Sequence, residues 1–213
     1  MKVRSVWLKA FGLWAALTLL CGGAYPLLVT VVGRLLFPEK AGGSLLRSGE
    51  KVVGSSLLAR APAGPGYFRP RPSACSWSTL PSGASNAAPT GAALTDSVRI
   101  RRARFQTENE PADGAEVPAE MLCASASGLD PHISVESARL QAGRVARERG
   151  LDEKTGAGLQ KLIEDRTEPR LWGLFGLPRV NVTLMNFMLD TIPEFRNFHQ
   201  EDGHDARPDP AEK

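Results

Sequence analysis

The chain has 213 residues and a formal net charge of +3. A charge this small and this mixed argues against a nucleic-acid-binding protein. The 21 glycines and 16 prolines are many for a helical protein and predict frequent turns. Apart from one apolar segment near the N-terminus, the remaining length suits one domain rather than two.

That apolar segment, residues 10–33, reads AFGLWAALTLLCGGAYPLLVTVVG and contains no charged residue. As a helix it would be about 36 Å long, enough to cross a hydrocarbon core of ~30 Å. The sequence therefore predicts a single transmembrane anchor within residues 1–37. Pro26 predicts a kink near mid-membrane, and Gly22-Gly23 leaves a flat patch that another helix can approach closely.

A cleaved signal peptide and a buried core helix are the alternatives. Gly22 and Ala24 stand at positions suited to signal cleavage, but the apolar run continues as far as Val32. Leucines, rather than small residues, precede Cys21, which argues against a lipoprotein signal. A core helix rarely runs this long without a charge, so we expect an uncleaved span.

Positive charges predict the orientation of this span. Lys2, Arg4 and Lys9 precede it and favour a cytoplasmic N-terminus. Arg34 and Lys40, on the other side, weaken this bias without reversing it. Residues 38–192 are then expected to form an extracytoplasmic domain.

The chain contains three cysteines. Cys21 lies in the apolar run, whereas Cys75 and Cys123 fall in the expected extracytoplasmic domain, where disulfides are permitted. Spacing alone does not establish the geometry that a disulfide needs, so a Cys75–Cys123 bridge and two free thiols both remain open.

Residues 38–109 read as turns, one strand and one helix. The prolines of YFRPRPS (67–73) disfavour helix and predict extended backbone. Thr95 is a candidate N-cap for the helix, in which four arginines cluster. A solvated helix face is the ordinary interpretation of such a cluster, and a phosphate- or partner-binding patch is the sharper one. The expected elements are a turn-rich stretch at 38–43, a strand at 51–58, a loop at 61–66, an irregular stretch at 75–93 and a helix at 94–109 with Arg99, Arg101, Arg102 and Arg104.

The rest of the chain completes a small α+β domain. Ser134 is a good N-cap for a helix that Gly150 would end in the left-handed conformation, and Asp152 would cap a second helix. Acidic residues and prolines in 193–213 predict a disordered tail. The expected elements are a turn and short buried strand at 117–125, helices at 135–149 and 152–165 (Leu159, Leu162 and Ile163 inward), a turn at 172–178, a strand at 180–182 and a helix at 184–189.

No familiar catalytic motif is present. The sequence has no P-loop, HExxH or CxxC pattern, so we expect no metal site and no catalytic residue. The segment closest to GxSxG, ASASG at 124–128, lacks the first glycine. An ordinary catalytic triad is not expected from Ser127, Asp130 and His132, because these residues are too close in the sequence. The alternative function that stays open is a membrane-anchored extracytoplasmic hydrolase using Ser127 and His132. His132 is more typical of a turn or capping residue than of a ligand.

Several segments occur together in an order typical of one family. The chain resembles the C subunit of the Kdp potassium-transporting ATPase, a bacterial P-type pump. The sequence differs from the family pattern at three places. The family usually has Leu-Gly at the positions of Ala87-Ala88, often Asn at the position of Gly91, and commonly Gly at the position of Ala126. The resemblance is carried by YFRPRPS at 67–73, GASN at 83–86 with Pro89-Thr90, SGLDPHIS at 127–134, Gln141 with RVA at 144–146, Gly150-Leu151, PRVNV at 178–182 and LD at 189–190.

The resemblance implies a non-catalytic subunit of a high-affinity, ATP-driven potassium uptake complex in the bacterial inner (plasma) membrane. Its partners would be a channel-like potassium-translocating subunit, a P-type ATP-hydrolysing subunit and the lipid bilayer. The family is regarded as needed for assembly and as a catalytic chaperone that raises ATP affinity, with no firmly bound cofactor.

The resemblance also implies site residues. Gln141 matches a glutamine that is linked to nucleotide in the family, so the resemblance implies ATP as a possible ligand. A third functional hypothesis is a stand-alone nucleotide-binding module that uses Gln141 and the basic helix. ATP is cytoplasmic, whereas the charge bias places Gln141 on the other side; the predicted topology therefore favours an assembly role. The family-motif residues are Asn86, Ser127, Gly128, Leu129, Asp130, Pro131, His132, Ser134 and Asn181.

Overall fold

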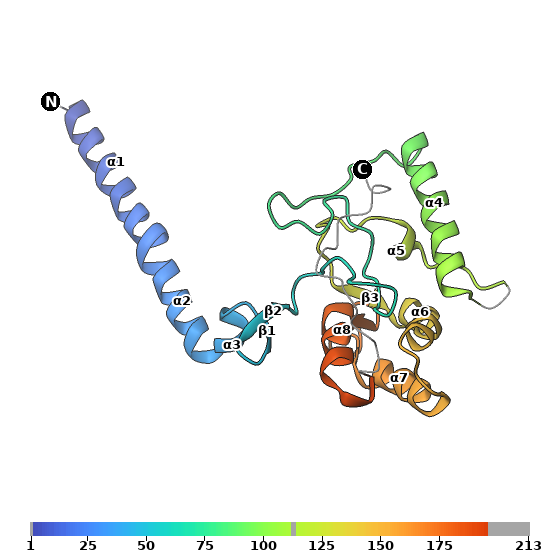
Figure 1. Ribbon diagram of the computed structural model, residues 1–213. Coiled ribbons are helices and arrows are strands. Elements are labelled where there is room, and N and C mark those ends of the chain that lie inside the picture. The colour runs from blue at the N-terminus through green and yellow to red at the C-terminus, as the bar shows by residue number, and fades with distance from the viewer. Residues whose placement is uncertain (1, 112–113, 196–213) are drawn as a thin grey trace. The chain divides into compact units, whose positions relative to one another are not determined.

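The computed structural model describes residues 2–111 and 114–195 (Figure 1). The chain divides into two compact units, Met1–Leu45 and Leu46–Lys213. Most of the predicted tail, residues 196–213, lies outside the described residues, and its first three residues form a 3₁₀ turn, η2 (Pro193–Phe195).

The first unit consists chiefly of the predicted apolar helix. α1 (Lys2–Leu19), a π-helical turn η1 (Leu20–Ala24) and α2 (Tyr25–Leu36) follow one another without a break. The π turn directly precedes Pro26, whose missing N–H removes one bond of the α-helical ladder. Within the described residues, Ser5–Leu36 is the one helix long and apolar enough to cross a membrane, with a mean hydropathy of 1.9. A signal sequence would pass the same test of length and composition.

Short strands form two small sheets. β1 (Leu45–Ser48) pairs with β2 (Lys51–Ser55), so the strand expected at 51–58 is confirmed over its first part. The second sheet is antiparallel, in the order β3 (His132–Ser134), β5 (Arg179–Asn181), β4 (Thr167–Glu168). Ile133 faces Val180 across the β3–β5 pair. β3 and β4 were not predicted, because two or three residues show no measurable alternation.

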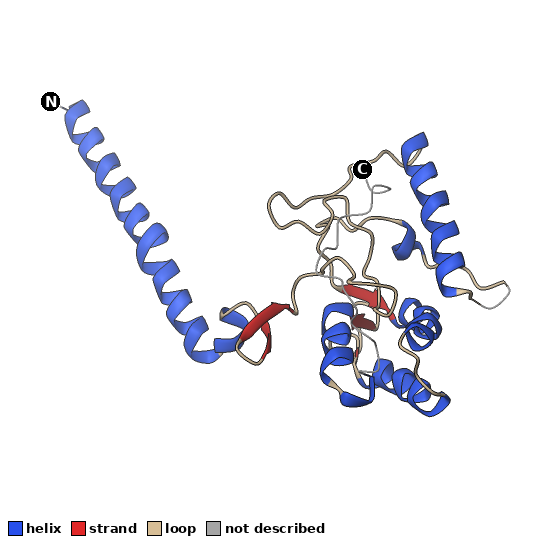
Figure 2. Ribbon diagram, viewed as in Figure 1, coloured by secondary structure: helices blue, strands red, loops and turns tan. Residues whose placement is uncertain are grey.

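Outside the apolar helix, most of the regular secondary structure is helical (Figure 2). The predicted caps are confirmed: the Ser134 and Asp152 side chains accept hydrogen bonds from the backbone N–H groups of Ser137 and Thr155, and Gly150 has a φ of +62°. The helices are α3 (Pro38–Ala41), α4 (Ala92–Asn109), α5 (Ala119–Leu122), α6 (Val135–Glu148), α7 (Glu153–Asp165) and α8 (Val182–Thr191).

Two local predictions were wrong. Thr95 is not an N-cap: α4 begins at Ala92, and the Thr95 hydroxyl donates back to the Gly91 carbonyl at 3.3 Å. The expected strand within 117–125 is the short helix α5, which Pro118 starts, because proline suits a helix N-terminus and Ala-Glu-Met-Leu are good helix formers. The expected turn-rich stretch at 38–43 consists of one helical turn, α3, followed by turns at Gly42 and Gly43.

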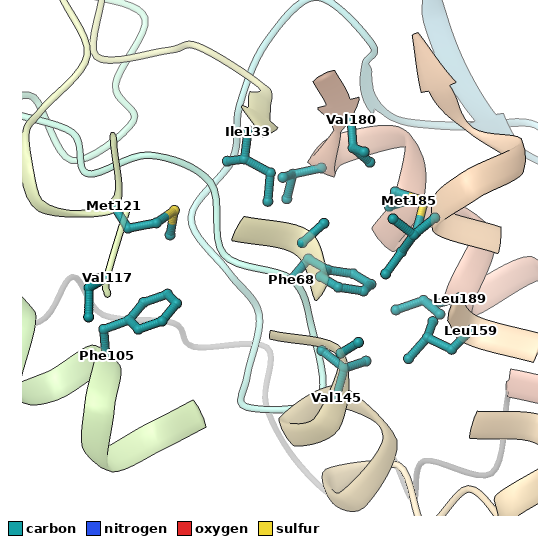
Figure 3. Packing of buried hydrophobic residues seen from close by; sticks show 14 of the residues in the cluster. Phe68, Phe105, Val117, Met121, Ile133, Val145, Leu159, Val180, Met185 and Leu189 are labelled. Carbon is teal, nitrogen blue, oxygen red and sulfur yellow. The ribbon is translucent and has the colours of Figure 1, made fainter. Parts of the chain in front are cut away.

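One hydrophobic cluster holds the domain together (Figure 3). Phe68, from an irregular segment, is 1% exposed and points among side chains of α6, α7 and α8. Phe105, Val117 and Met121 form the side of the cluster under α4 and α5. The other labelled members are Ile133, Val145, Leu159, Val180, Met185 and Leu189.

Gly128 lies where two loops touch. Its φ is +70°, and a Cβ there would stand 2.4 Å from the Cys75 sulfur and 2.9 Å from the Gly83 carbonyl oxygen. Only glycine therefore fits without a shift of backbone. Cys75 itself is a free thiol, as is Cys123, so the disulfide alternative is not formed in this structure.

We predict that Gly128→Ala lowers the free energy of unfolding by about 3 kcal/mol, because the new methyl group meets backbone in a disfavoured conformation. Gly143→Ala is the matched control, since that site in α6 has nothing within 4 Å. It should raise the unfolding free energy by about 0.5–1 kcal/mol. Thermal unfolding of the full chain in detergent measures both changes, and equal changes of the same sign would contradict the prediction.

Candidate functional site

Two side-chain amides clamp an irregular segment of the backbone. Gln141, in α6, accepts from the Arg69 N–H at 2.7 Å and donates to the Arg69 carbonyl at 3.2 Å. Asn186, in α8, makes the same pair with Phe68, at 2.9 and 2.8 Å. Each amide thus pairs with both backbone polar groups of one residue, as a neighbouring β-strand would. These hydrogen bonds satisfy the backbone next to the buried Phe68 ring.

Two buried arginines extend this clamp. The Arg144 guanidinium donates to the Asn109 Oδ1 and the Gln141 Oε1, each at 2.9 Å, and to the carbonyl oxygens of Tyr67, at 3.0 Å, and Pro65. Burial lowers the pKa of Arg144 to about 10, so it is still charged at neutral pH. These contacts and those of Gln141 and Asn186 define the clamped segment, residues 65–69.

Arg149 secures the other side of the clamped segment. It donates to the Gly66 carbonyl at 2.6 Å and to the Asp190 carboxylate at 3.1 Å, and its guanidinium lies 4.5 Å from the centre of the Tyr67 ring. The Tyr67 hydroxyl also donates to Asp190, at 2.9 Å. Burial, followed by the Asp190 charge, raises the pKa of Tyr67. A buried cation thereby joins the C-terminal ends of α6 and α8.

The SGLDPHIS segment, residues 127–134, links the remaining elements. The Ser73 hydroxyl donates to the Gly128 carbonyl at 2.7 Å, the Ala59 N–H donates to the Leu129 carbonyl at 2.9 Å, and the Val182 N–H donates to the Pro131 carbonyl at 2.8 Å. The segment ends in β3, and its last residue, Ser134, caps α6. Its carbonyl groups therefore bind two loops and the start of α8, all distant in the sequence.

Asp130 and His132 form a polar cluster beside this segment. Asp130 accepts from the His132 N–H at 3.0 Å and from Arg71 at 3.3 Å, and the two ring nitrogens of His132 lie 3.4 Å from Asp130 and 3.6 Å from Glu168. Hydrogen bonding from the His132 side chain lowers the pKa of Asp130. Asn181 caps α8 through Leu184 and places its amide 3.5 Å from His132 Nε2.

Cavities are lined by several of these described residues. One, of ≈ 810 Å³, is lined by Arg71, Asp130, His132, Glu168 and apolar residues of 171–178. A second, ≈ 410 Å³, lies between α8 and the β1–β2 hairpin. A third, ≈ 70 Å³, is lined by Trp77 and by Arg69, Arg101 and Arg104, but is smaller than the ~300–1,000 Å³ of ordinary ligand pockets.

Comparison with known proteins places this architecture in a family. The family model described as "K+-transporting ATPase, c chain" (KdpC) matches residues 7–191. The chain belongs to the KdpC family. A protein of Rhodospirillum rubrum named "Potassium-transporting ATPase KdpC subunit" is 48% identical over 183 residues, which cover 85% of this chain and 93% of that protein.

 A "Potassium-transporting ATPase KdpC subunit" of Cereibacter sphaeroides is 47% identical over 175 residues, which cover 82% of this chain and 91% of that protein. Another, from Dechloromonas aromatica, is 42% identical over 186 residues, which cover 86% of this chain and 95% of that protein.

Family membership confirms the resemblance and identifies a subunit of a membrane-associated K⁺-transporting ATPase. The structure brings most of the family-motif residues together, because residues 127–134 and Asn181 meet at the β3–β5 pair. Asn86 is the exception: it is exposed, with a φ of +49°, and none of its described contacts joins it to the others. Local sequence patterns do not indicate what Asn186, Arg144 and Arg149 contribute, because the partners of these side chains lie far away in the sequence.

Gln141 lies in the clamp rather than on the surface. Its side chain is 0% exposed, and its amide makes hydrogen bonds to the Arg69 backbone and to Arg144. The basic helix is also engaged internally: Arg101 donates to the Leu122 carbonyl at 3.0 Å, and Arg104 pairs with Glu108 at 2.9 Å. These two arginines of α4 therefore support the fold as well as carrying charge.

The residues of the hydrolase alternative do not form a catalytic pair. The Ser127 hydroxyl accepts from the Leu129 N–H at 3.1 Å. His132 instead neighbours Asp130, Glu168 and Asn181, and in the part of the chain that the structure describes no hydrogen bond joins it to Ser127. A nucleophile and its base need such a contact, so this geometry does not support serine hydrolase chemistry.

We predict a pH-dependent effect of Asp130→Asn. Since the folded-state pKa lies below the ordinary value of 3.8, the carboxylate stabilises the fold above that pH, and this stabilisation is lost as the pH falls through the folded-state pKa. At pH 7 the variant should be less stable by about 1 kcal/mol, and the difference should shrink below pH ~4. Chemical unfolding across this pH range measures it.

Asp165→Asn, which removes a carboxylate from an exposed position at the end of α7, is the matched control. A difference between Asp130→Asn and the parent that stays constant through acid pH would contradict the assigned role of Asp130.

Proposed function

We propose that this chain is the non-catalytic subunit of a high-affinity, ATP-driven potassium uptake complex and is needed for the assembly of that complex. The observation that carries the proposal is the family match over residues 7–191, which includes both the apolar helix and the folded domain. Its partners in this proposal are a channel-like potassium-translocating subunit and a P-type ATP-hydrolysing subunit. Hydrolysis of ATP belongs to the second of these partners.

The proposed topology has one span in the bacterial inner membrane, a cytoplasmic N-terminus and an extracytoplasmic domain at residues 38–192. Support comes from the positive charges that precede the span and from the length of the helix Ser5–Leu36. In this topology the domain would lie over the potassium entrance of the channel-like partner.

The apolar helix also suits a docking role. A Cβ built at Gly22 or Gly23 meets nothing within 4 Å, so both glycines leave open space on the helix surface. Small residues let a second helix approach closely, and the π turn that contains both glycines gives the helix a local shape that a plain anchor does not need. We propose that this face contacts a helix of the channel-like subunit.

We predict that a strain without this chain loses growth at micromolar potassium and loses the assembled complex.

Gly22→Leu and Gly23→Leu should loosen the complex, because a bulky side chain blocks close helix approach. Gly12→Leu, at another open position of the same helix, is the matched control. Co-purification with the partner subunits measures assembly, and normal assembly and transport without the chain would refute the proposal.

A second proposed role is to raise the ATP affinity of the ATP-hydrolysing subunit, as the resemblance implies. Because Gln141 is buried and bonded on both atoms of its amide, a direct nucleotide contact would require the clamp to open. We therefore propose that Gln141 acts by holding the clamped segment in place, and that any effect on nucleotide passes through the packing of the domain.

Asn186 provides a matched control for this idea, since it makes the equivalent pair of bonds from α8. We predict that Gln141→Leu and Asn186→Leu each lower the unfolding free energy by about 2 kcal/mol, because each leaves buried backbone groups without partners. The two variants should also change the KM for ATP of the assembled complex alike. A rise in KM with Gln141→Leu alone would instead indicate a direct nucleotide contact.

A further inference from the structure

One exposed loop carries an unusual concentration of large apolar side chains. We call residues 170–178 the apolar loop. Soluble surfaces carry scattered apolar residues, but a contiguous group of this kind marks a contact with a protein or a membrane. The exposed fractions are 60% for Leu171, 81% for Trp172, 74% for Leu174, 61% for Phe175 and 72% for Leu177.

The loop has a defined shape of its own. The Leu171 N–H donates to the Phe175 carbonyl at 2.9 Å, and the Phe175 N–H donates back to Leu171 at 3.0 Å. Trp172 has a φ of +54°, which is rare for a bulky residue, and its ring meets Phe175 edge-on at 6.3 Å between centroids. The loop thus has a defined turn in which its apolar side chains stay largely exposed, and Leu171, Phe175 and Leu177 also line the ≈ 810 Å³ cavity.

Charge is arranged around the loop and not within it. Arg170 and Arg179 mark its two ends, and the residues between them carry no charge. Arg179 pairs with Glu168 at 2.8 Å, while Arg170 is exposed. A tryptophan among aliphatic side chains, bordered by arginines, matches the chemistry of the membrane interface, where indole rings lie at headgroup level and cations meet phosphates.

The length of the chain keeps the domain near a bilayer. The apolar helix ends at Leu36 and the second compact unit begins at Leu46. Fully extended, the residues between them reach roughly 30 Å. The linker is shorter than this limit, because it contains α3 and the first residue of β1.

We propose that the apolar loop inserts Trp172, Leu174 and Phe175 into the interfacial layer of the lipid bilayer, as a second membrane contact of the domain. This goes beyond the assembly role and depends only on the part of that proposal that places the helix in the membrane. The commitment is to lipid, because the loop combines exposed aromatic and aliphatic side chains with the exposed Arg170 and has no acidic residue.

The test uses the full chain in nanodiscs of phosphatidylcholine and phosphatidylglycerol, with and without bromine near the glycerol end of the acyl chains. The changes Trp7→Phe, Trp14→Phe and Trp77→Phe leave Trp172 as the single reporter. We expect brominated lipid to remove most of its emission. The control keeps Trp77 and changes Trp172→Phe instead, and its emission should persist. Unquenched Trp172, or equal quenching of both reporters, overturns the proposal.

The assembled complex gives a second, independent measurement. A photo-crosslinking amino acid replaces Leu174 in the complex within the same nanodiscs, and the same replacement at the exposed Leu80 is the control. We expect lipid adducts from position 174 and none from position 80. A crosslink from position 174 to another subunit shows that the loop docks on protein, and this also overturns the proposal. Because complex assembly is read from the same samples, failure of the loop contact is distinguishable from failure of the subunit role.

Discussion

The clamp on residues 65–69 is the interaction on which the rest of the domain depends. This segment has no regular structure and places Phe68 in the centre of the hydrophobic cluster. Its backbone groups cannot be buried without partners, and Gln141, Asn186, Arg144 and Arg149 supply them. Each of these side chains comes from, or directly follows, α6 or α8, so one irregular segment joins two helices.

The SGLDPHIS segment also joins distant parts of the domain, but through its own backbone carbonyl groups. Its carbonyl groups bind two distant loops and the start of α8, and its C-terminal residues form β3 and the cap of α6. Both segments explain why a domain with only two small sheets has a defined core. They also explain the dense packing at Gly128, where a side chain would push two loops apart.

Two apolar surfaces remain outside this packing, the N-terminal helix and the apolar loop. The helix has no buried residue in α2 and the loop has five large side chains largely exposed. Exposed apolar area of this kind is favourable only when it leaves water, so both surfaces suit a contact with lipid or with another protein. A subunit of a membrane-bound ATPase provides a setting for both, and lipid and partner helices are the chemistries proposed to cover them.

The sequence by itself determined the features that depend on local chemistry. Length and lack of charge predicted the apolar helix, the side chains of Ser134 and Asp152 predicted two helix starts, and the motif order predicted the family. Only the tertiary structure decided the rest. β3 and β4 are too short to show a period, α5 depends on burial of Met121 and Leu122, and the burial of Gln141 follows from contacts with Arg69, 72 residues away. Such contacts depend on packing between distant segments, for which neighbouring residues carry no signal.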